Sequence, residues 1–268
     1  MLSLRLCSAV TGRHAATSIS SSVEMLQSEL ESEKEKLQSE LKRVKEKLQS
    51  ELKREKEAHR AEKDKRPAEL RWWRSAQLCA VDVTLDPDTA HPHLVLSEDR
   101  KHVRHGDRRQ DLPDKPERFD KYPIVLGAER FTGGRRYWEV EVGDKTGWTL
   151  GVCRESVRRK GKVTPKPEDG YWVMRLRDGE YEACTGPTTP LPVSVRPGRV
   201  GIFLDYEGGE ISFYNVTDVS RLFTFTDTFS RTLRPYFCPG PNAGGTNAAP
   251  LIICPVPAPA RGYRCTLL

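Results

Sequence analysis

Apolar and charged residues alternate along residues 135–144, and this pattern is the clearest indication of secondary structure in the chain. Between Tyr137 and Val142, Trp and Val alternate with Tyr and Glu. A period of two is typical of a β-strand with one buried face and one wet face. Residues 143–145 (Gly-Asp-Lys) supply a turn, and the alternation resumes over 147–153. The pattern therefore predicts a β-hairpin here.

Short segments of the same kind continue to residue 254, separated by Gly, Pro and Asp. This spacing predicts a mainly β domain over residues 71–257, built as a two-layer antiparallel sandwich. The glycine-rich stretch Tyr206–Glu210 predicts a hairpin turn between two of the strands. The predicted core residues are Trp138, Val140, Leu150, Val152, Ile202, Leu204 and Phe213. The predicted strands cover residues 81–84, 94–96, 101–104, 123–127, 136–142, 147–153, 171–176, 180–183, 200–205, 210–214, 222–226, 234–238 and 250–254.

An eleven-residue repeat occupies residues 26–58, in which LQSELESEKEK is followed by two close copies. Eleven residues fill three turns of α-helix, so the repeated leucines stay on one face. The third position of that face is Glu33, Val44 and Glu55 in successive copies, which interrupts the apolar row. Residues 21–70 are thus predicted to be a charged helix, either an isolated spacer or a coiled coil that forms a homodimer through 26–58.

The boundaries of this helix are set by composition. Pro67 is expected to end it, because the residue before a proline is disfavoured in the α region. Trp72 and Trp73 follow and are expected to pack the helix end against the domain. Residues 1–20 contain two Arg and no acid, which weakly resembles a mitochondrial transit peptide, but a disordered N-terminus is favoured. Residues 258–268 are expected to be a disordered tail.

Charge and cysteine content exclude several classes of protein. Residues 21–70 hold 13 basic and 13 acidic residues, so the net charge of +6 is spread thinly elsewhere. We therefore expect no nucleic-acid partner, which would require a concentrated basic stripe. Seven Cys without a Cys-x-x-Cys pair indicate reduced thiols and a cytoplasmic location. No apolar run reaches 18 residues, so no insertion into a membrane is expected.

Sequence signatures of catalysis and metal binding were sought and not found. The chain has no Gly-x-Ser-x-Gly, no phosphate-cradling glycine loop and no His-Glu-x-x-His. His91, His93, His102 and His105 are close in sequence, but their spacing is not that of a structural zinc site. We therefore expect no catalytic residues, no metal and no cofactor.

Five segments, taken in order, resemble the PRY-SPRY domain of tripartite-motif ubiquitin ligases and butyrophilins. They are LDPDTAHPHLVLSED (85–99), PERFDKYPIVLGAERFTGGRRYWEVEV (116–142), GWTLGVC (147–153), VGIFLDYEGGEISFYN (200–215) and LRPYFCPG (233–240). The resemblance runs from about residue 76 to 255. It implies a concanavalin-like jelly roll that binds ligands through variable loops.

The region before the domain differs from both architectures. No Cys/His spacing typical of a RING or B-box precedes residue 70, so the polypeptide by itself is not expected to be an enzyme. The eleven-residue repeats resemble the helical stem of butyrophilins, although the membrane helix and ectodomain of those proteins are not in the sequence. The resemblance implies the intracellular tail of one of these architectures, or a splice form of it.

The resemblance and the charge pattern together predict a binding face formed by residues 104–123 and 154–172, two basic segments expected to lie near one another. Charge runs are usually solvated, so each single residue is a weaker prediction than the face. Arg136 and Arg175 are expected to form the floor between the segments. Some family members that bind antibodies carry Trp where this chain has Arg175 and Arg177, and phosphate-sensing butyrophilins carry His where it has Arg136. The predicted contacts are Arg108, Arg109, Lys121, Arg136, Arg158, Arg159, Lys160, Lys162, Arg175, Arg177, Asp205 and Tyr206.

The leading functional hypothesis is a non-catalytic module that binds a protein or peptide, in innate immunity or in ubiquitin-pathway targeting. One alternative is the substrate-recognition part of a tripartite-motif ubiquitin ligase. Another is the phosphate-sensing intracellular tail of a butyrophilin.

Overall fold

The computed structural model describes the backbone of residues 3–256, and side chains over residues 25–57, 70–242 and 244–256. The chain divides into two compact units, residues 1–66 and 67–268. The tail expected over residues 258–268 lies outside the described part. Among the described residues, no helix combines the length and the apolar character needed to cross a membrane.

Helix α1 (Ser3–Gln77) is longer than the sequence predicted. It begins at Ser3, where residues 1–20 were expected to be disordered, and it continues through Pro67, which was expected to end it. A proline inside a helix removes one hydrogen bond and costs about 3 kcal/mol. It does not disturb the bonds of the other turns, which continue the helix to Gln77. There, i to i+3 bonds from Leu78 and Cys79 tighten the last turn and end the helix.

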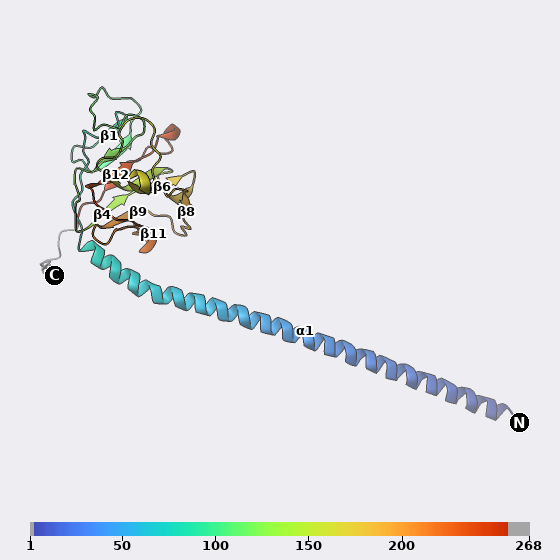
Figure 1. Ribbon diagram of the computed structural model, residues 1–268. Coiled ribbons are helices and arrows are strands. Elements are labelled where there is room, and N and C mark those ends of the chain that lie inside the picture. Colours follow the sequence, from blue (N-terminus) through green and yellow to red (C-terminus); the bar gives the residue numbers. More distant parts are fainter. Residues whose placement is uncertain (1–2, 257–268) are drawn as a thin grey trace. The chain divides into compact units, whose positions relative to one another are not determined.

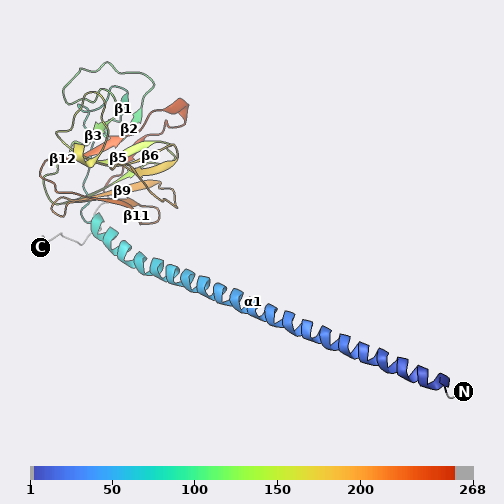
Figure 2. The same ribbon diagram turned by 45° about the vertical axis from the view of Figure 1, so that its right-hand side comes forward.

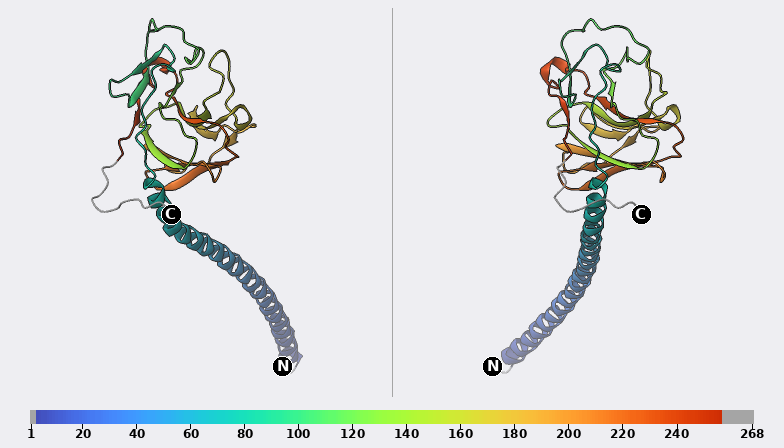
Figure 3. Two further views of the ribbon diagram at one scale, coloured as in Figure 1. Left: turned by 60° about the vertical axis from the view of Figure 1, so that its left-hand side comes forward. Right: turned by 90° about the vertical axis from the view of Figure 1, so that its left-hand side faces the viewer.

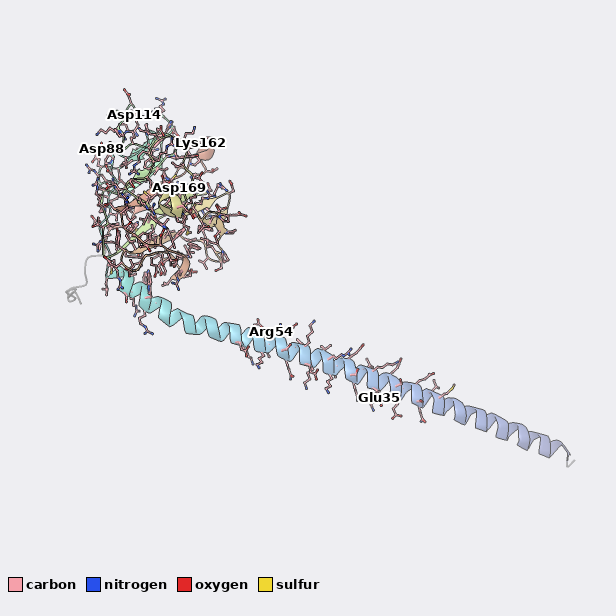
Figure 4. The ribbon with its side chains drawn as sticks, in the orientation of Figure 1. Glu35, Arg54, Asp88, Asp114, Lys162 and Asp169 are labelled. Carbon is pink, nitrogen blue, oxygen red and sulfur yellow. The ribbon has the colours of Figure 1, made fainter. Side chains whose placement is uncertain are left out.

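The leucines of the eleven-residue repeat lie exposed on α1. Figure 4 shows side chains projecting from the helix around Glu35 and Arg54, and every described side chain from 25 to 57 is exposed. The apolar side chains among them are between 51% and 69% exposed. This is the face that the sequence predicted for a coiled coil, and it has no partner within residues 25–57.

Two antiparallel sheets make up the rest of the described chain, as labelled in Figure 1 and seen from other sides in Figures 2 and 3. The first has seven strands in the order β1-β2-β13-β4-β9-β10-β11, and the second has six in the order β3-β12-β5-β6-β7-β8. They confirm the predicted antiparallel sandwich. The strands are β1 (Leu94–Leu96), β2 (His102–His105), β3 (Val125–Leu126), β4 (Arg135–Glu141), β5 (Trp148–Arg154), β6 (Tyr171–Arg177), β7 (Glu180–Ala183), β8 (Thr189–Pro190), β9 (Arg199–Asp205), β10 (Glu210–Asn215), β11 (Ser220–Thr226), β12 (Leu233–Cys238) and β13 (Leu251–Ile253); short 3-10 turns, η1 (Pro167–Asp169) and η2 (Ala243–Gly245), lie between them.

The core lies between the sheets and contains every residue predicted for it. Trp138 and Val140 of β4 meet Leu150 and Val152 of β5 in one buried cluster, none of them more than 2% exposed. Packing is so close that a Cβ at Gly151 would lie 2.2 Å from a backbone oxygen of β6. Glycine at this position therefore lets neighbouring chains approach.

The predicted hairpin between β4 and β5 is wrong, because the two strands belong to different sheets. β4 pairs with β9 and β13, whereas β5 pairs with β6 and β12. The connection crosses from one sheet to the other, and buried Lys145 within it donates to the carbonyl oxygens of Asn247 and Ala249. The apolar faces of β4 and β5 thus meet across the core. The hairpin predicted around Gly209 is confirmed, since β9 and β10 pair directly.

The strand predicted at 81–84 is also absent, although Val83 is fully buried. Only isolated bridges occur nearby, at Ala80 and Leu85. Just before them, the end of α1 packs on the outer face of the seven-stranded sheet, as the sequence predicted. The Trp72 ring stacks on Tyr214 at 4.4 Å, and the Trp73 indole N–H donates to the Tyr137 hydroxyl at 3.2 Å.

Candidate functional site

The two basic segments predicted to form the binding face lie in contact with one another. We call them the first loop (residues 104–123) and the second loop (residues 154–172). The backbone N–H of Asp120 donates to the Arg159 carbonyl at 3.4 Å, and the Asp120 carboxylate accepts from the Gly161 N–H at 2.8 Å. Figure 4 shows Asp114 of the first loop and Lys162 of the second at the same end of the domain. The predicted proximity of the loops is confirmed.

Arg159 and Lys160, both predicted ligand contacts, are used to join the loops. The Arg159 guanidinium lies 4.9 Å from the Phe119 ring centroid and donates to the Glu155 carbonyl at 2.7 Å. Lys160 forms an ion pair with Asp114 and donates to the Lys115 carbonyl at 2.9 Å. Hydrogen bonding and charge from Lys160 lower the pKa of the Asp114 carboxyl below its usual value. Both side chains are half-buried.

Arg118, another cation of the first loop, is buried instead of solvated. It is 4% exposed, and its guanidinium donates to the carbonyl oxygens of Pro113, Pro87 and Ala90. Bonds to charged donors are among the stronger ones in proteins. Arg118 therefore fixes the first loop to the preceding turn.

A surface hollow of about 710 Å³ opens beside the second loop. Its walls include four cations, two of which have partners. Lys166 faces Asp169 at 3.8 Å, and the Arg154 guanidinium lies 5.3 Å from the Trp172 ring centroid. The other two, Arg158 and Lys162, are exposed and form no ion pair with a described residue. They are the cations of this hollow available to a ligand.

Three further predicted contacts, Arg108, Arg109 and Lys121, are exposed on the first loop. They extend the positive surface away from the hollow. None of them forms an ion pair with a residue in the described part of the chain, so they too are available to an acidic ligand.

A second group of predicted contacts lies at the turn between β9 and β10. Asp205 pairs with Arg135 at 2.7 Å, and the Tyr206 hydroxyl donates to the Arg231 carbonyl at 3.0 Å. The Arg136 guanidinium donates to the Arg135 carbonyl and lies 5.9 Å from a Phe ring centroid. These side chains are close to one another, but their contacts stay within this turn and the start of β4.

Arg175 and Arg177 form a third group, on the β6–β7 hairpin. Both face Glu182, at 2.5 Å from Arg175 and 4.0 Å from Arg177. Arg175 is thus in the six-stranded sheet, whereas Arg136 is in the seven-stranded sheet. No described hydrogen bond or ion pair joins either residue to the two loops. The structure therefore does not bring them together as a floor.

The residues that sequence reasoning missed are the ones that hold the loops together. Asp114, Asp120 and Phe119 each meet a residue of the second loop. The signal available in the sequence was the presence of acids within otherwise basic loops, since such acids find the nearest cations. Among the described residues, no group of three or more His, Cys, Asp or Glu side chains is arranged to hold a metal ion.

Comparison with known proteins agrees with this architecture. Residues 83–131 match the family model of the SPRY-associated domain, named PRY, and residues 135–252 match that of the SPRY domain. The chain belongs to the PRY-SPRY family. Its PRY-SPRY domain resembles those of both tripartite-motif proteins and butyrophilins, and PRY-SPRY domains are protein-interaction domains.

Several curated relatives are similar over the domain. The chain is 60% identical over 193 residues to human erythroid membrane-associated protein, covering 72% of this chain and 41% of that protein. It is 55% identical over 197 residues to human butyrophilin subfamily 1 member A1, covering 73% and 36%. It is 53% identical over 181 residues to bovine E3 ubiquitin-protein ligase TRIM21, covering 66% and 39%. The chain thus spans less than half the length of each relative.

Solved structures show the same fold. The crystal structure of the TRIM65 PSpry domain matches with a TM-score of 0.59 at 26% identity, covering 68% of this chain and 94% of that one. The stonustoxin structure matches with a TM-score of 0.56 at 29% identity, covering 66% and 29%. The PRY-SPRY domain of this chain is therefore a β-sandwich of known type.

Proposed function

We propose that this chain is a non-catalytic binding module, whose PRY-SPRY domain holds an acidic protein or peptide segment against the second loop. The observation that supports this proposal is the exposure of Arg158 and Lys162 at the 710 Å³ hollow, without an ion-pair partner among the described residues. Neighbouring Arg159 and Lys160 hold the loop in place. A binding surface on a pre-formed loop loses less conformational entropy when its ligand binds.

The walls of the hollow suit an acidic peptide. Ser156 and Thr164 add hydroxyl groups that can donate to a carboxylate, and Val163 adds apolar surface. Glu168 and Asp169 at one side disfavour acidic groups there, which gives the ligand an orientation. The exposed Arg108, Arg109 and Lys121 of the first loop extend the positive field and favour encounter with an acidic partner.

The test starts from peptides selected by the full chain from a random-sequence display library. Selected peptides are expected to be rich in Asp and Glu, and their affinity, measured by fluorescence anisotropy, should fall as salt rises. The double reversal R158E/K162E should weaken binding at least about tenfold, which is about 1.4 kcal/mol. The double reversal R100E/R221E is the matched control, because both residues are exposed cations elsewhere on the domain.

Equal affinity in R158E/K162E and R100E/R221E would place the ligand site elsewhere. Competition by inorganic pyrophosphate, with no selection of acidic peptides, would favour the phosphate-sensing alternative suggested by the butyrophilin relatives. In a cell, we propose that the module acts in the cytoplasm, where the five free cysteines among the described residues stay reduced. There it would select targets for innate immunity or for a ubiquitin ligase with which it associates.

We also propose that α1 forms a homodimer through residues 26–58, which would present two PRY-SPRY domains. Six leucines, Met25 and Val44 are exposed along the described part of the helix, and burying a leucine side chain contributes about 1.5–3 kcal/mol. Glu33 and Glu55 interrupt the row and limit the affinity. Two linked domains would bind a repeated ligand far more tightly than one.

Sedimentation equilibrium of the full chain tests the homodimer. The wild-type chain should populate a dimer, L37S/L41S should be monomeric, and E33L/E55L should dimerise more tightly. A monomeric wild-type chain at about 100 times the domain's ligand Kd would contradict the proposal, because avidity could then not operate.

A further inference from the structure

Three histidine rings form a stack at the base of the first loop. The ring centroids of His91 and His93 are 5.5 Å apart and those of His93 and His105 are 5.3 Å apart, with interplanar angles of 21° and 15°. We call these three residues the histidine stack. His105 ends β2 where the first loop leaves the sheet, and His91 lies in the turn that precedes β1.

The hydrogen bonds of His91 require a neutral ring. Its Nε2 lies 3.1 Å from the carbonyl oxygen of Asp120, which can only accept, so Nε2 carries the proton. Its Nδ1 lies 3.2 Å from the backbone nitrogen of His93, which donates to it. A second proton, at Nδ1, would set two N–H groups against each other and break this bond. In the described part of the chain, Nδ1 of His93 and Nδ1 of His105 are buried and have no hydrogen-bond partner.

The bonds that hold the first loop to the domain surround this stack. Gly106 N–H donates to the His93 carbonyl at 2.7 Å, and Gln110 N–H donates to the Pro92 carbonyl at 2.9 Å. Near the other end of the loop, Asp120 accepts from His91, and Phe119 N–H donates to the Thr89 carbonyl at 3.1 Å. Both ends of the loop are therefore attached to residues 89–93, which carry two of the three rings.

We propose that the histidine stack is a proton-operated latch, which holds the first loop closed when its rings are neutral and releases it on acidification. A charge on any one ring lies about 5 Å from its neighbour, so further protonation is opposed by repulsion. Protonated His91 also loses the bond from His93 N–H. Opening the loop restores water to the rings and relieves both penalties.

The charged groups around the stack favour the neutral rings. Arg109 of the first loop faces His91, and burial together with this charge and the other two rings lowers the pKa of His91 to about 4. Burial also lowers the pKa of His105, and Lys145 adds to this effect while Asp107 opposes it. The Asp120 carboxylate is engaged by the Gly161 N–H.

The size of the effect follows from proton linkage. With a His91 pKa of about 4 in the closed loop and the ordinary 6.5 in the open loop, the open form binds more protons between these values. The ratio of open to closed loop should therefore rise about 30-fold between pH 7.5 and pH 5. Because the first loop braces the second through Asp114 and Asp120, acidification would also disturb the proposed ligand surface.

Hydrogen exchange of the full chain, followed by mass spectrometry and corrected for the intrinsic effect of pH, tests the latch. Peptides covering residues 106–123 should lose protection about 30-fold from pH 7.5 to pH 5, while peptides covering β9 and β10 should not change. His91→Gln retains a donor towards Asp120 and cannot titrate, so its loop protection should be independent of pH. His102→Gln is the matched control, because His102 lies in the same strand outside the stack, and it should respond as the wild type does.

Loss of protection in His91→Gln equal to that in the wild type, or a wild-type change below about threefold, would overturn the latch. Should His91→Gln fail to fold, an NMR titration of the wild-type histidine rings decides: a His91 pKa near 4 supports the latch, and a value above 6 overturns it. The latch acts on the loop surface proposed above. The exchange measurement uses no ligand, however, so its failure would leave the proposed ligand site untouched.

Discussion

Arg158 and Arg159 are neighbours in sequence, yet replacing each by alanine should have opposite consequences. The Arg159 guanidinium covers the Phe119 ring at 4.9 Å and donates to the Glu155 carbonyl at 2.7 Å, within a half-buried side chain. The exposed Arg158 has no ion-pair partner among the described residues. Arg159→Ala should therefore lower the free energy of unfolding of the domain, whereas Arg158→Ala should leave it unchanged.

The magnitude follows from the two contacts of Arg159. A cation–π contact of this kind contributes about 0.5–2 kcal/mol, and a hydrogen bond from a charged donor contributes about 1.5–3 kcal/mol. Arg159→Ala should thus cost about 2–4 kcal/mol. At roughly 3 °C per kcal/mol for a domain of this size, the melting temperature should fall by roughly 6–12 °C. Arg158→Ala, as an exposed substitution, should stay within about 0.5 kcal/mol of the wild type.

Tryptophan fluorescence during urea unfolding is the assay, because all five Trp lie between residues 72 and 172. The signal therefore reports on the PRY-SPRY domain and its attached helix end, and not on the leucine repeat. Peptide affinity measured in parallel should fall in both variants, in Arg158→Ala through a lost contact and in Arg159→Ala through a displaced loop. A wild-type midpoint for Arg159→Ala, or equal destabilisation by the two substitutions, would refute this division of roles.

Four further outcomes are expected. Trp138→Ala, at a 2% exposed core position, should destabilise the domain by about 3–5 kcal/mol, measured by the same unfolding assay; unchanged unfolding would remove it from the core. Asn247→Ala should cost at least about 3 kcal/mol, because its carboxamide makes five hydrogen bonds to backbone groups, and a cost below about 1 kcal/mol would contradict this. Since the folded-state pKa of His91 is about 4, below its ordinary 6.5, unfolding should become easier as pH falls from 6.5 towards 4, by up to about 3 kcal/mol in total, and His91→Gln should remove this dependence. The purified chain supplied with ubiquitin, E1 and E2 should form no ubiquitin conjugates, and autoubiquitination would refute this expectation.

The sequence by itself determined where the strands and the core lie. Alternation at Trp138, Val140, Leu150 and Val152 matches the pleat of a β-strand, so the pattern alone decides which side chains face inward. The eleven-residue repeat decided the helix in the same way, since its period fits three turns. These are local properties, and residues close in sequence carry them.

Only the tertiary structure decided which strands become neighbours. Alternation shows that β4 and β5 each have an apolar face, but side-by-side pairing and opposition across a core both satisfy that pattern. The choice depended on partners far along the chain, such as β9 for β4 and β12 for β5. Val83 is buried for the same kind of reason, although its segment forms no strand.

The candidate site shows the same limit for charge. The sequence located two basic loops, but a count of cations does not distinguish Arg158 from Arg159. That distinction was decided by Phe119 and the Glu155 carbonyl, and for Lys160 by Asp114, which is 46 residues away. Coulomb and cation–π interactions depend on distances of a few ångströms, and such distances are set by the fold and not by the order of residues.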